Sequence, residues 1–409
     1  MLKDNCMIAQ SGGPTAVINN SLAGAIEAAS CSEAIGEIYG ASHGVLGILE
    51  EKLLDLRRED PAAIQGLRYT PGAALGSCRY QLQKEADYEK LLQIFNRHNI
   101  RYFFYIGGND SMDTACKIDR LAREEGYELQ VIGIPKTVDN DLPLTDHCPG
   151  YGSAAKYLAT IVLEMGIDIR SIVTSTKVAI VEAMGRNTGW LAAAAALARR
   201  GEGDAPHLIY LPETAFDREA FLSDVEAVYC RYGTVLIVVS EGLVDKNGNY
   251  IFNDAATKDV FGHQRLGGLG QYLLEQIESE LHIKGRFVLP ATSQRSAMHL
   301  ASRTDAEEAY HTGRIAVAEA LRGASGRMVA INRLEGEEYR CNYELVDLDR
   351  VANQEKKVPR SWINATGNDI TPDFIKYAQP LIQGEVNIPY HGGLPAYVNL
   401  ARYPAGKRD

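Results

Sequence analysis

Two consecutive segments decide the fold, RYFFYIGGNDSMDTA at residues 101–115 and LQVIGIPKTVDND at residues 129–141. In each, a short apolar run stops at Gly or Pro, and charged and amide side chains follow. A short β-branched and aromatic run bounded by Gly or Pro is typical of a buried parallel strand, and open parallel sheets bind ligands at the carboxyl ends of their strands. We therefore expect both polar segments to lie at one edge of a parallel sheet.

Length and composition limit what these segments serve. The chain has 409 residues, of which 45% are hydrophobic, so it exceeds the size at which a single core stops growing and predicts two domains. The formal net charge of -11 argues against general binding to nucleic acid or to an anionic membrane, because both need a basic surface. A small anion held by a local cluster of Lys and Arg stays compatible with this charge.

Cysteine usage and hydropathy indicate the compartment. The seven cysteines include no C-x-x-C pair, so neither a structural zinc site nor a disulfide framework is signalled. The first residues lack the apolar core of a signal peptide, and no apolar run approaches the roughly 18 residues of a membrane span. We expect a cytoplasmic protein with reduced thiols and no membrane association.

The first loop that could bind an anion is the turn SGGPTA at residues 11–16, between a short strand and a helical pattern. Backbone N–H groups in such a turn hold anions, because Gly allows close approach and the helix dipole favours negative charge. A Gly-Gly-Pro turn is about as often only a tight turn, so both interpretations stay open. Neither G-x-x-x-x-G-K-[ST] nor a G-x-G-x-x-G after a strand occurs in the chain.

Further strands end in the same way, at MGRN (184–187) and SEGL (240–243), and five such ends on alternating β and α signals indicate a shared ligand edge. The groups expected there are the carboxylates Asp110, Asp139, Asp141 and Glu241 and the cations Arg79, Lys136, Lys177, Arg186, Arg286 and Arg295. Phosphoryl transfer needs this combination, because the protein aligns two oxygens and neutralises developing charge with cations and Mg²⁺. Asp residues before a helix also serve as N-caps, and single cations often lie on a solvated face.

In this order the motifs SGGPTA, GSCR, GGNDS, PKTVDND, MGR, SEG and R-x8-R closely resemble the phosphofructokinase family from Met7 to about Thr304. The resemblance implies an α/β fold of two Rossmann-like three-layer domains with the active site in the cleft between them. We expect a donor-phosphate domain at 1–150, joined by part of 288–325, and a sugar-phosphate domain at 151–287. Residues 326–409 form a C-terminal extension without an assignment.

The resemblance also implies the reaction, a reversible phosphoryl transfer to the 1-hydroxyl of fructose 6-phosphate in glycolysis and gluconeogenesis. Asp139 would be the general base, supported by Thr137 and Asp141. The residues expected to hold the sugar phosphate are Thr137, Val138, Asp139, Asp141, Lys177, Met184, Gly185, Arg186, Glu241, Arg286 and Arg295. Because some 6-phosphate ligands come from a neighbouring subunit in this family, we expect a homodimer or homotetramer.

Donor choice depends on two positions. Family members that use ATP have Gly at the places of Asp110 and Lys136, whereas members that use pyrophosphate have Asp and Lys there. A carboxylate at Asp110 would intrude on the α-phosphate and nucleoside of ATP through its bulk and its like charge, and the Lys136 ammonium would neutralise a small leaving group. We expect pyrophosphate as donor, Lys136 as a catalytic group, and Gly12, Arg79, Asp110 and Lys136 as the donor-phosphate ligands.

Mg²⁺ is the cofactor that the resemblance implies. Asn109 stands where most relatives have a metal-linked Asp, and a neutral amide is a poorer ligand for a hard cation. Asp110 could take over the metal beside Asn109, or Mg²⁺ could arrive mainly on pyrophosphate. Two other functions stay open, an ATP-dependent kinase of the same family and a non-catalytic sugar-phosphate-binding protein.

Overall fold

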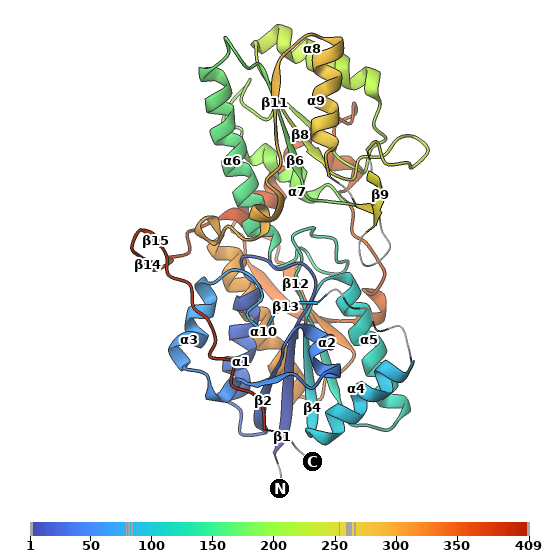
Figure 1. Ribbon diagram of the computed structural model, residues 1–409, viewed down its shortest axis with the longest axis vertical. Helices are drawn as coiled ribbons and strands as arrows, with labels where there is room; N and C mark the ends of the chain where they lie inside the picture. The colour runs from blue at the N-terminus through green and yellow to red at the C-terminus, as the bar shows by residue number, and fades with distance from the viewer. Residues whose placement is uncertain are drawn as a thin grey trace. The chain divides into compact units, whose positions relative to one another are not determined.

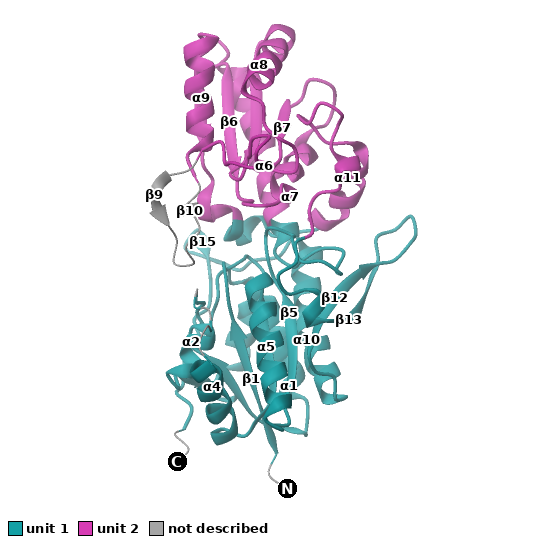
Figure 2. Cartoon of the chain, turned by 90° about the vertical axis from the view of Figure 1, so that its right-hand side faces the viewer, with its two compact units in different colours: residues 1–153, 295–355, 384–409 teal, residues 154–294, 356–383 magenta. Residues whose placement is uncertain are grey.

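The computed structural model describes residues 3–406 except 79, 81, 83–84, 253, 259–263 and 266. Between 253 and 266 it gives only the backbone of the strands β9 (Asp254–Lys258) and β10 (Gln264–Arg265). The chain divides into two compact units (Figure 2). Unit 1 comprises residues 1–153, 295–355 and 384–409, and unit 2 comprises residues 154–294 and 356–383. The C-terminal stretch after residue 326 therefore contributes to both units.

Unit 1 is built on a seven-stranded sheet in the order β13-β12-β5-β4-β1-β2-β3. The five central strands are parallel, and the two edge strands β3 and β13 are antiparallel to their neighbours. The strands are β1 (Asp4–Gln10), β2 (Ile35–Ala41), β3 (Leu53–Asp55), β4 (Ile100–Gly107), β5 (Gln130–Pro135), β12 (Arg327–Arg333) and β13 (Cys341–Asp347).

Helices cover both faces of this sheet (Figure 1). Successive residues of β1 show the reason, because Met7 and Ala9 pack in one buried cluster while Ile8 packs in another. Side chains alternate across a strand, so a strand that is apolar at every position is buried on both faces. The helices are α1 (Ile18–Ser30), α2 (Gly44–Leu49), α3 (Pro61–Gly66), α4 (Glu85–Arg97), α5 (Asn109–Glu124) and α10 (Arg303–Leu321).

Unit 2 has a four-stranded parallel sheet in the order β11-β6-β8-β7. Its strands are β6 (Val178–Ala183), β7 (Leu208–Tyr210), β8 (Val235–Ser240) and β11 (Gly285–Val288). Its helices are α6 (Tyr151–Ser171, of which 154–171 belong to unit 2), α7 (Trp190–Ala194), α8 (Arg218–Tyr232), α9 (Leu269–Glu280) and α11 (Pro372–Ala378). Both units thus have the α/β architecture that the sequence predicts.

Each unit has one further local feature, an aromatic cluster in unit 2 and a small hairpin in unit 1. In unit 2, Trp190 and Trp362 lie edge to face with ring centroids 6.0 Å apart, and Phe374 and Tyr377 complete this aromatic cluster. In unit 1, the hairpin of β14 (Tyr390–His391) and β15 (Leu394–Pro395) leaves Tyr390 60% and Leu394 72% exposed. Among the described residues, no helix combines the length and the apolar character that crossing a bilayer requires.

Candidate active site

The polar segments that follow β4 and β5 leave the same edge of the unit 1 sheet. Strands β4 and β5 pair in parallel, with Gly107 opposite Pro135. After Gly107 the chain turns into α5, whose first turn carries Asp110. After Pro135 it enters the long loop at residues 136–150, which contains Asp139. Because adjacent parallel strands end side by side, Asp110 and this loop lie at one carboxyl edge, as the pattern predicts.

Two consecutive glycines make room for two cations at this edge. Gly12 has a φ of +74°, and a Cβ atom there would lie 3.1 Å from the Lys136 ammonium. A Cβ atom at Gly13 would lie 2.9 Å from the Arg295 guanidinium. Larger residues would therefore displace these charges. The Gly-Gly turn is a cradle for two cations, and Arg295, which the resemblance assigns to the sugar 6-phosphate, lies in unit 1 with it.

The Lys136 side chain is 2% exposed and donates a hydrogen bond of 2.8 Å from Nζ to the carbonyl of Gly13. Burial lowers the pKa of this ammonium to about 8, because the charged form loses its hydration. The Asp139 carboxylate opposes the shift, and the nearby Arg295 adds to it. The ammonium is therefore largely charged at neutral pH, but it has few partners to compensate its burial. It is suited to an anion that supplies the missing charge.

The loop that carries Asp139 is held by its own polar groups. Thr137 donates its backbone N–H to the carbonyl of Pro149 at 3.1 Å, and its Oγ1 accepts from the N–H of Asp139 at 3.1 Å. Buried Asn140 has a φ of +55° and accepts from the N–H of Cys148 through Oδ1 at 2.9 Å. These bonds close the loop into a compact unit that fixes the backbone of Asp139.

A buried charged network anchors the far end of this loop. His147 is 1% exposed and bonds to Asp146 through Nδ1 at 2.8 Å and to Glu308 through Nε2 at 2.6 Å. Burial opposes the charged imidazole, but the carboxylates of Glu308 and Asp146 outweigh it and raise the pKa of His147 to about 9. Asp146 also pairs with Arg333 at 3.0 Å, and Glu308 accepts from the Tyr339 hydroxyl at 2.5 Å.

Asp305 holds the exit of the loop. This carboxylate is 1% exposed and accepts hydrogen bonds from the N–H of Gly150 at 2.8 Å, from the N–H of Ser153 at 2.9 Å and from the Ser153 hydroxyl at 2.5 Å. Burial raises the pKa of Asp305 to about 6 despite these donors. Sequence reasoning missed His147 and Asp305. The run DHCPG at 146–150 was a weak signal, because it puts ionisable residues directly after the polar loop.

The first turn of α5 presents the two candidate metal ligands. The Asp110 carboxylate is exposed, and it forms no hydrogen bond or ion pair with another described residue. The amide of Asn109 is engaged: its Oδ1 accepts from the N–H of Asn353 at 2.7 Å, and its Nδ2 donates to the carbonyl of Gln354. Of the two, Asp110 has the charge and the open coordination that a hard cation prefers.

Unit 2 gathers a second set of predicted residues at the carboxyl edge of its own sheet. Strands β6 and β8 are neighbours with Ala183 opposite Ser240, so Met184–Arg186 and Glu241 leave the same edge. Gly185 has a φ of +140°, and its N–H donates to the Glu241 carboxylate at 3.3 Å. The Ser240 hydroxyl donates to the carbonyl of Gly185 at 2.6 Å, and Gln294 accepts from the N–H of Met184 at 3.1 Å. These bonds shape a polar loop pair around Arg186.

Lys177 and Arg286 lie at the other edge of this sheet, so the prediction that all six cations gather at carboxyl ends is wrong. Lys177 immediately precedes β6, and Arg286 is the second residue of β11, opposite Ala179. A six-residue strand is roughly 20 Å long, and this length separates Lys177 from Met184. Lys177 donates from Nζ to the Tyr229 hydroxyl at 2.6 Å. The single shared edge is also wrong, because the polar strand ends divide between two sheets.

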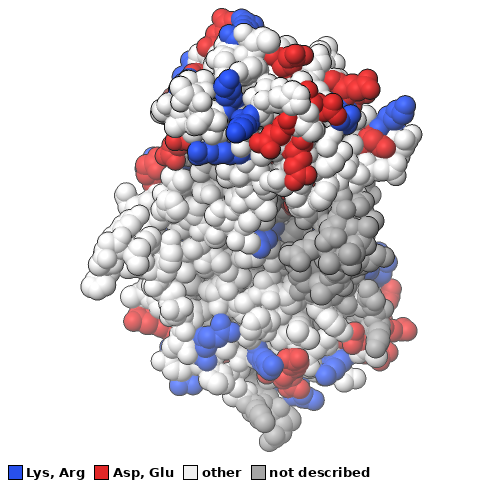
Figure 3. All heavy atoms as spheres, turned by 45° about the horizontal axis from the view of Figure 1, so that its top comes forward, with Lys and Arg blue, Asp and Glu red and all other residues white. Residues whose placement is uncertain are grey.

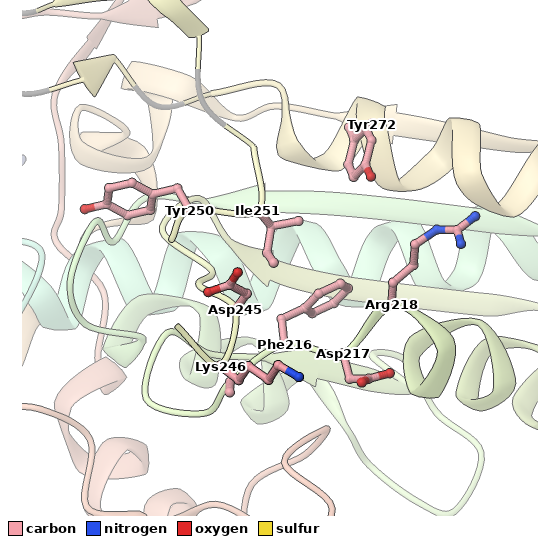
Figure 4. Close-up of a pocket in the computed structure, with 9 residues that line it drawn as sticks. Phe216, Asp217, Arg218, Asp245, Lys246, Tyr250, Ile251 and Tyr272 are labelled. Atoms are coloured by element: carbon pink, nitrogen blue, oxygen red, sulfur yellow. The ribbon is translucent and has the colours of Figure 1, made fainter. Parts of the chain in front are cut away.

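Several other charges of unit 2 form ion pairs on the surface. Figure 3 shows Lys and Arg interspersed with Asp and Glu over the upper part of that view. The ion pairs of unit 2 include Arg231–Glu202 and Arg170–Asp204. A pocket of about 480 Å³ lies among Phe216, Lys246, Tyr250 and Tyr272 (Figure 4). Arg218, which also lines it, is bound to Gln276 at 2.7 Å and to Glu280 at 2.6 Å. None of the predicted site residues lines this pocket.

Arg79 lies outside the described residues, so nothing is assigned to its side chain. Within the described part of the chain, no group of three or more His, Cys, Asp or Glu side chains is arranged to hold a metal ion. Val138 and Asp141 belong to the loop at 136–150, and Val138 is 8% exposed.

The chain is similar to known proteins over most or all of its length. The family model described as phosphofructokinase matches residues 5–318. The chain is 46% identical to the "Pyrophosphate--fructose 6-phosphate 1-phosphotransferase" of Xanthomonas campestris, with 100% of this chain and 99% of that protein covered. It is also 46% identical to the protein of the same name from Halomonas elongata, with 98% and 97% covered. A solved structure of a pyrophosphate-dependent phosphofructokinase from Marinobacter aquaeolei matches with a TM-score of 0.91 and 43% identity, over 99% of this chain and 98% of that one.

Proposed function

The chain belongs to the phosphofructokinase family, and from this premise we propose that it transfers a phosphoryl group from pyrophosphate to fructose 6-phosphate. The products are fructose 1,6-bisphosphate and phosphate, and the reaction is reversible. The relatives that match over nearly the full chain carry the name of this activity. The resemblance of the motifs and the geometry of both units support the same function.

The burial of Lys136 is the observation that supports pyrophosphate as the donor. Its ammonium lies against Gly12 and Gly13 with its pKa lowered to about 8. A buried cation whose lost hydration is poorly compensated is stabilised most by a compact, highly charged anion. Pyrophosphate concentrates its charge on two phosphorus atoms, whereas ATP must also fit its nucleoside beside the carboxylate of Asp110. Lys136 attracts the first donor, and Asp110 opposes the second.

In the proposed mechanism Asp139 removes the proton from the 1-hydroxyl of the sugar. The oxygen then attacks the near phosphorus atom of pyrophosphate, the bridging P–O bond breaks, and phosphate leaves with the negative charge. Lys136 stabilises that charge, and the N–H groups at the start of α5 add the positive end of the helix dipole. The loop bonds of Thr137 and Asn140 hold Asp139 in place for the proton transfer.

The residues of this edge fit Mg²⁺, which we propose as the cofactor. Mg²⁺ usually keeps several waters and binds through one or two carboxylates together with substrate phosphates. The exposed carboxylate of Asp110 would supply one such ligand at the N-terminus of α5. When bound, the metal neutralises charge on the phosphate oxygens. Lys136, Arg295 and Asp139 then act on the donor and acceptor through their own side chains.

Unit 2 supplies the proposed contacts to the sugar phosphate. Met184, Gly185, Arg186 and Glu241 share one edge and suit the sugar hydroxyls and its phosphate. Lys177 and Arg286 share the opposite edge. Since one edge of one sheet does not hold all of these groups, we propose a homo-oligomer in which Lys177 and Arg286 serve a second copy of the chain. The molar mass from sedimentation equilibrium tests this, and a monomer under assay conditions contradicts it.

One assay tests the reaction. Purified protein receives fructose 6-phosphate and Mg²⁺ with either pyrophosphate or ATP, and fructose 1,6-bisphosphate is measured. Turnover with pyrophosphate alone is the expected result. Turnover with ATP alone would identify an ATP-dependent kinase instead, and no turnover with either donor would identify a sugar-phosphate-binding protein without catalysis.

A further inference from the structure

The side chain of Asn109 holds a remote segment of the chain against the N-terminus of α5. Its Oδ1 accepts a hydrogen bond of 2.7 Å from the N–H of Asn353, and its Nδ2 donates to the carbonyl of Gln354. The amide thus pairs with two successive backbone groups that lie 244 and 245 positions further along the sequence. A single side chain that satisfies both a donor and an acceptor of one segment fixes that segment's position and orientation.

The docked segment, residues 351–354, has further anchors on the same helix. Asn353 has a φ of +59° and donates from Nδ2 to the Asp113 carboxylate at 2.9 Å, one turn along α5. Val351, at 0% exposure, packs in the same buried cluster as Met112 of α5. Apolar burial therefore holds the start of the segment, and Asn109 and Asp113 hold its end.

The position of this segment matters because Asp110 lies between the two anchors on α5. The start of α5 is the place proposed for the donor phosphates, and pyrophosphate ends at its second phosphorus atom. A nucleotide must continue over the neighbouring surface. The docked segment occupies surface at the first two turns of α5, where it leaves less room for such a continuation.

We propose that Asn109 is a positioning residue for donor specificity, because it docks residues 351–354 so that the segment hinders the binding of donors larger than pyrophosphate. The inference rests on the proposed function. It gives Asn109 a role different from that of a metal ligand, since its two polar atoms bind the segment. Donor choice then depends on a third element besides Asp110 and Lys136, and this element comes from the C-terminal part of the chain.

The first test measures docking without any assay of activity. In wild-type protein the amide of Asn353 is bonded to Asn109, so its hydrogen exchange is slowed. Asn109→Ala removes both bonds and should speed exchange in a peptide covering residues 349–356 by about tenfold or more. Asn342→Ala, which changes an exposed Asn on β13 of the same unit, is the matched control and should leave this exchange unchanged.

The second test measures donor selectivity as the ratio of kcat/KM for ATP to kcat/KM for pyrophosphate. Asn109→Ala should raise this ratio about tenfold when added to Asp110→Gly, as expected for removing one obstacle from a pocket. Asn109→Asp separates the two roles of the residue. A metal ligand would gain affinity from the carboxylate and lower the Mg²⁺ concentration for half-saturation, whereas docking predicts an unchanged Mg²⁺ requirement and faster exchange of Asn353.

Three outcomes would overturn the proposal: unchanged exchange at 349–356 in Asn109→Ala, faster exchange with an unchanged donor ratio, or a lower Mg²⁺ requirement in Asn109→Asp. Asn353→Gly guards against a variant that fails to fold, because Gly keeps the positive φ and removes only the bond to Asp113. It should raise exchange and the donor ratio to an intermediate extent. A wild-type protein without turnover of pyrophosphate would instead overturn the proposed function, and exchange would still measure the docking.

Discussion

Lys136 and Lys177 each lie next to a buried parallel strand, but their side chains have different surroundings. Lys136 follows β5, is buried, and faces the Gly12–Gly13 turn with Asp139 and Arg295 around it. Lys177 precedes β6, and its Nζ binds the Tyr229 hydroxyl at the opposite edge of its sheet. A charge that follows a strand therefore lies at the carboxyl edge, where parallel sheets bind ligands, whereas a charge that precedes a strand lies at the opposite edge.

The largest expected effect comes from changing Asp139, the carboxylate near Lys136. Asp139→Ala should lower kcat with pyrophosphate by roughly 10²- to 10⁴-fold, because a positioned base contributes about this much. Binding of fructose 6-phosphate, measured by calorimetry, should survive. Turnover near that of wild type would show that another group takes the proton.

The loop that follows Lys136 is anchored by His147, which bonds to Asp146 and Glu308. The pKa of His147 is raised from 6.5 to about 9 in the folded state, so its stabilising contribution is complete below pH 6.5 and is lost as pH rises through about 9. The shift corresponds to about 3 kcal/mol. His147→Gln should lower the free energy of unfolding by this amount at pH 6 and by much less at pH 10, as measured by urea unfolding followed with far-UV circular dichroism.

Donor choice is the next effect in size. Asp110→Gly combined with Lys136→Gly should allow turnover with ATP and raise the ATP-to-pyrophosphate ratio of kcat/KM at least about tenfold. The reason is that the variant removes both the carboxylate that repels the nucleotide and the cation that favours the small donor. A folded variant that still rejects ATP would show that other residues decide the donor.

The lowered pKa of Lys136 predicts a pH dependence of donor binding. Its charge is lost as pH rises through about 8, so the KM for pyrophosphate should rise by up to about fivefold between pH 8 and 9. Lys136→Met should have a high KM that lacks this rise. The same shift has the opposite effect on stability. Between about pH 8 and 10.5 the unfolded state binds more protons than the folded state, so the contribution of Lys136 to the free energy of unfolding increases with pH.

The smallest expected effect lies at the other edge. Lys177→Met should raise the KM for fructose 6-phosphate by at most about tenfold, because one charged hydrogen bond is lost while the other cations remain. The KM for pyrophosphate should not change. Lys284→Met, an exposed lysine directly before β11, is the matched control. An equal effect of Lys177→Met on both substrates would remove the distinction between the two edges.

Much of this arrangement could be predicted from the sequence, because it follows from local patterns. The apolar runs before Gly107 and Lys136 identify adjacent strands, and the charged residues after them lie at one edge. The wrong placements of Lys177 and Arg286 have one cause: both stand at the start of a strand, and the length of a strand separates its start from its carboxyl end. The division of the strand ends between two sheets depends on pairing partners that no local pattern specifies.

Contacts between parts of the chain that are distant in sequence could not be predicted either. Asn109 binds Asn353 and Gln354, and His147 binds Glu308 across 161 positions. Both depend on tertiary packing rather than on motif or periodicity. Asn109 could be recognised as unusual in the resemblance to the family, but only the fold gives the physical reason for an amide there, since an amide both accepts and donates and a carboxylate only accepts.

The aromatic cluster of unit 2 has a practical consequence for measuring how this protein unfolds. The chain has two tryptophans, and both belong to this cluster. Fluorescence excited at the indole band therefore monitors unit 2 alone, and melting of unit 1 would not change this signal. A thermal scan in which fluorescence and ellipticity change at different temperatures would reveal two independently melting halves rather than instrumental disagreement.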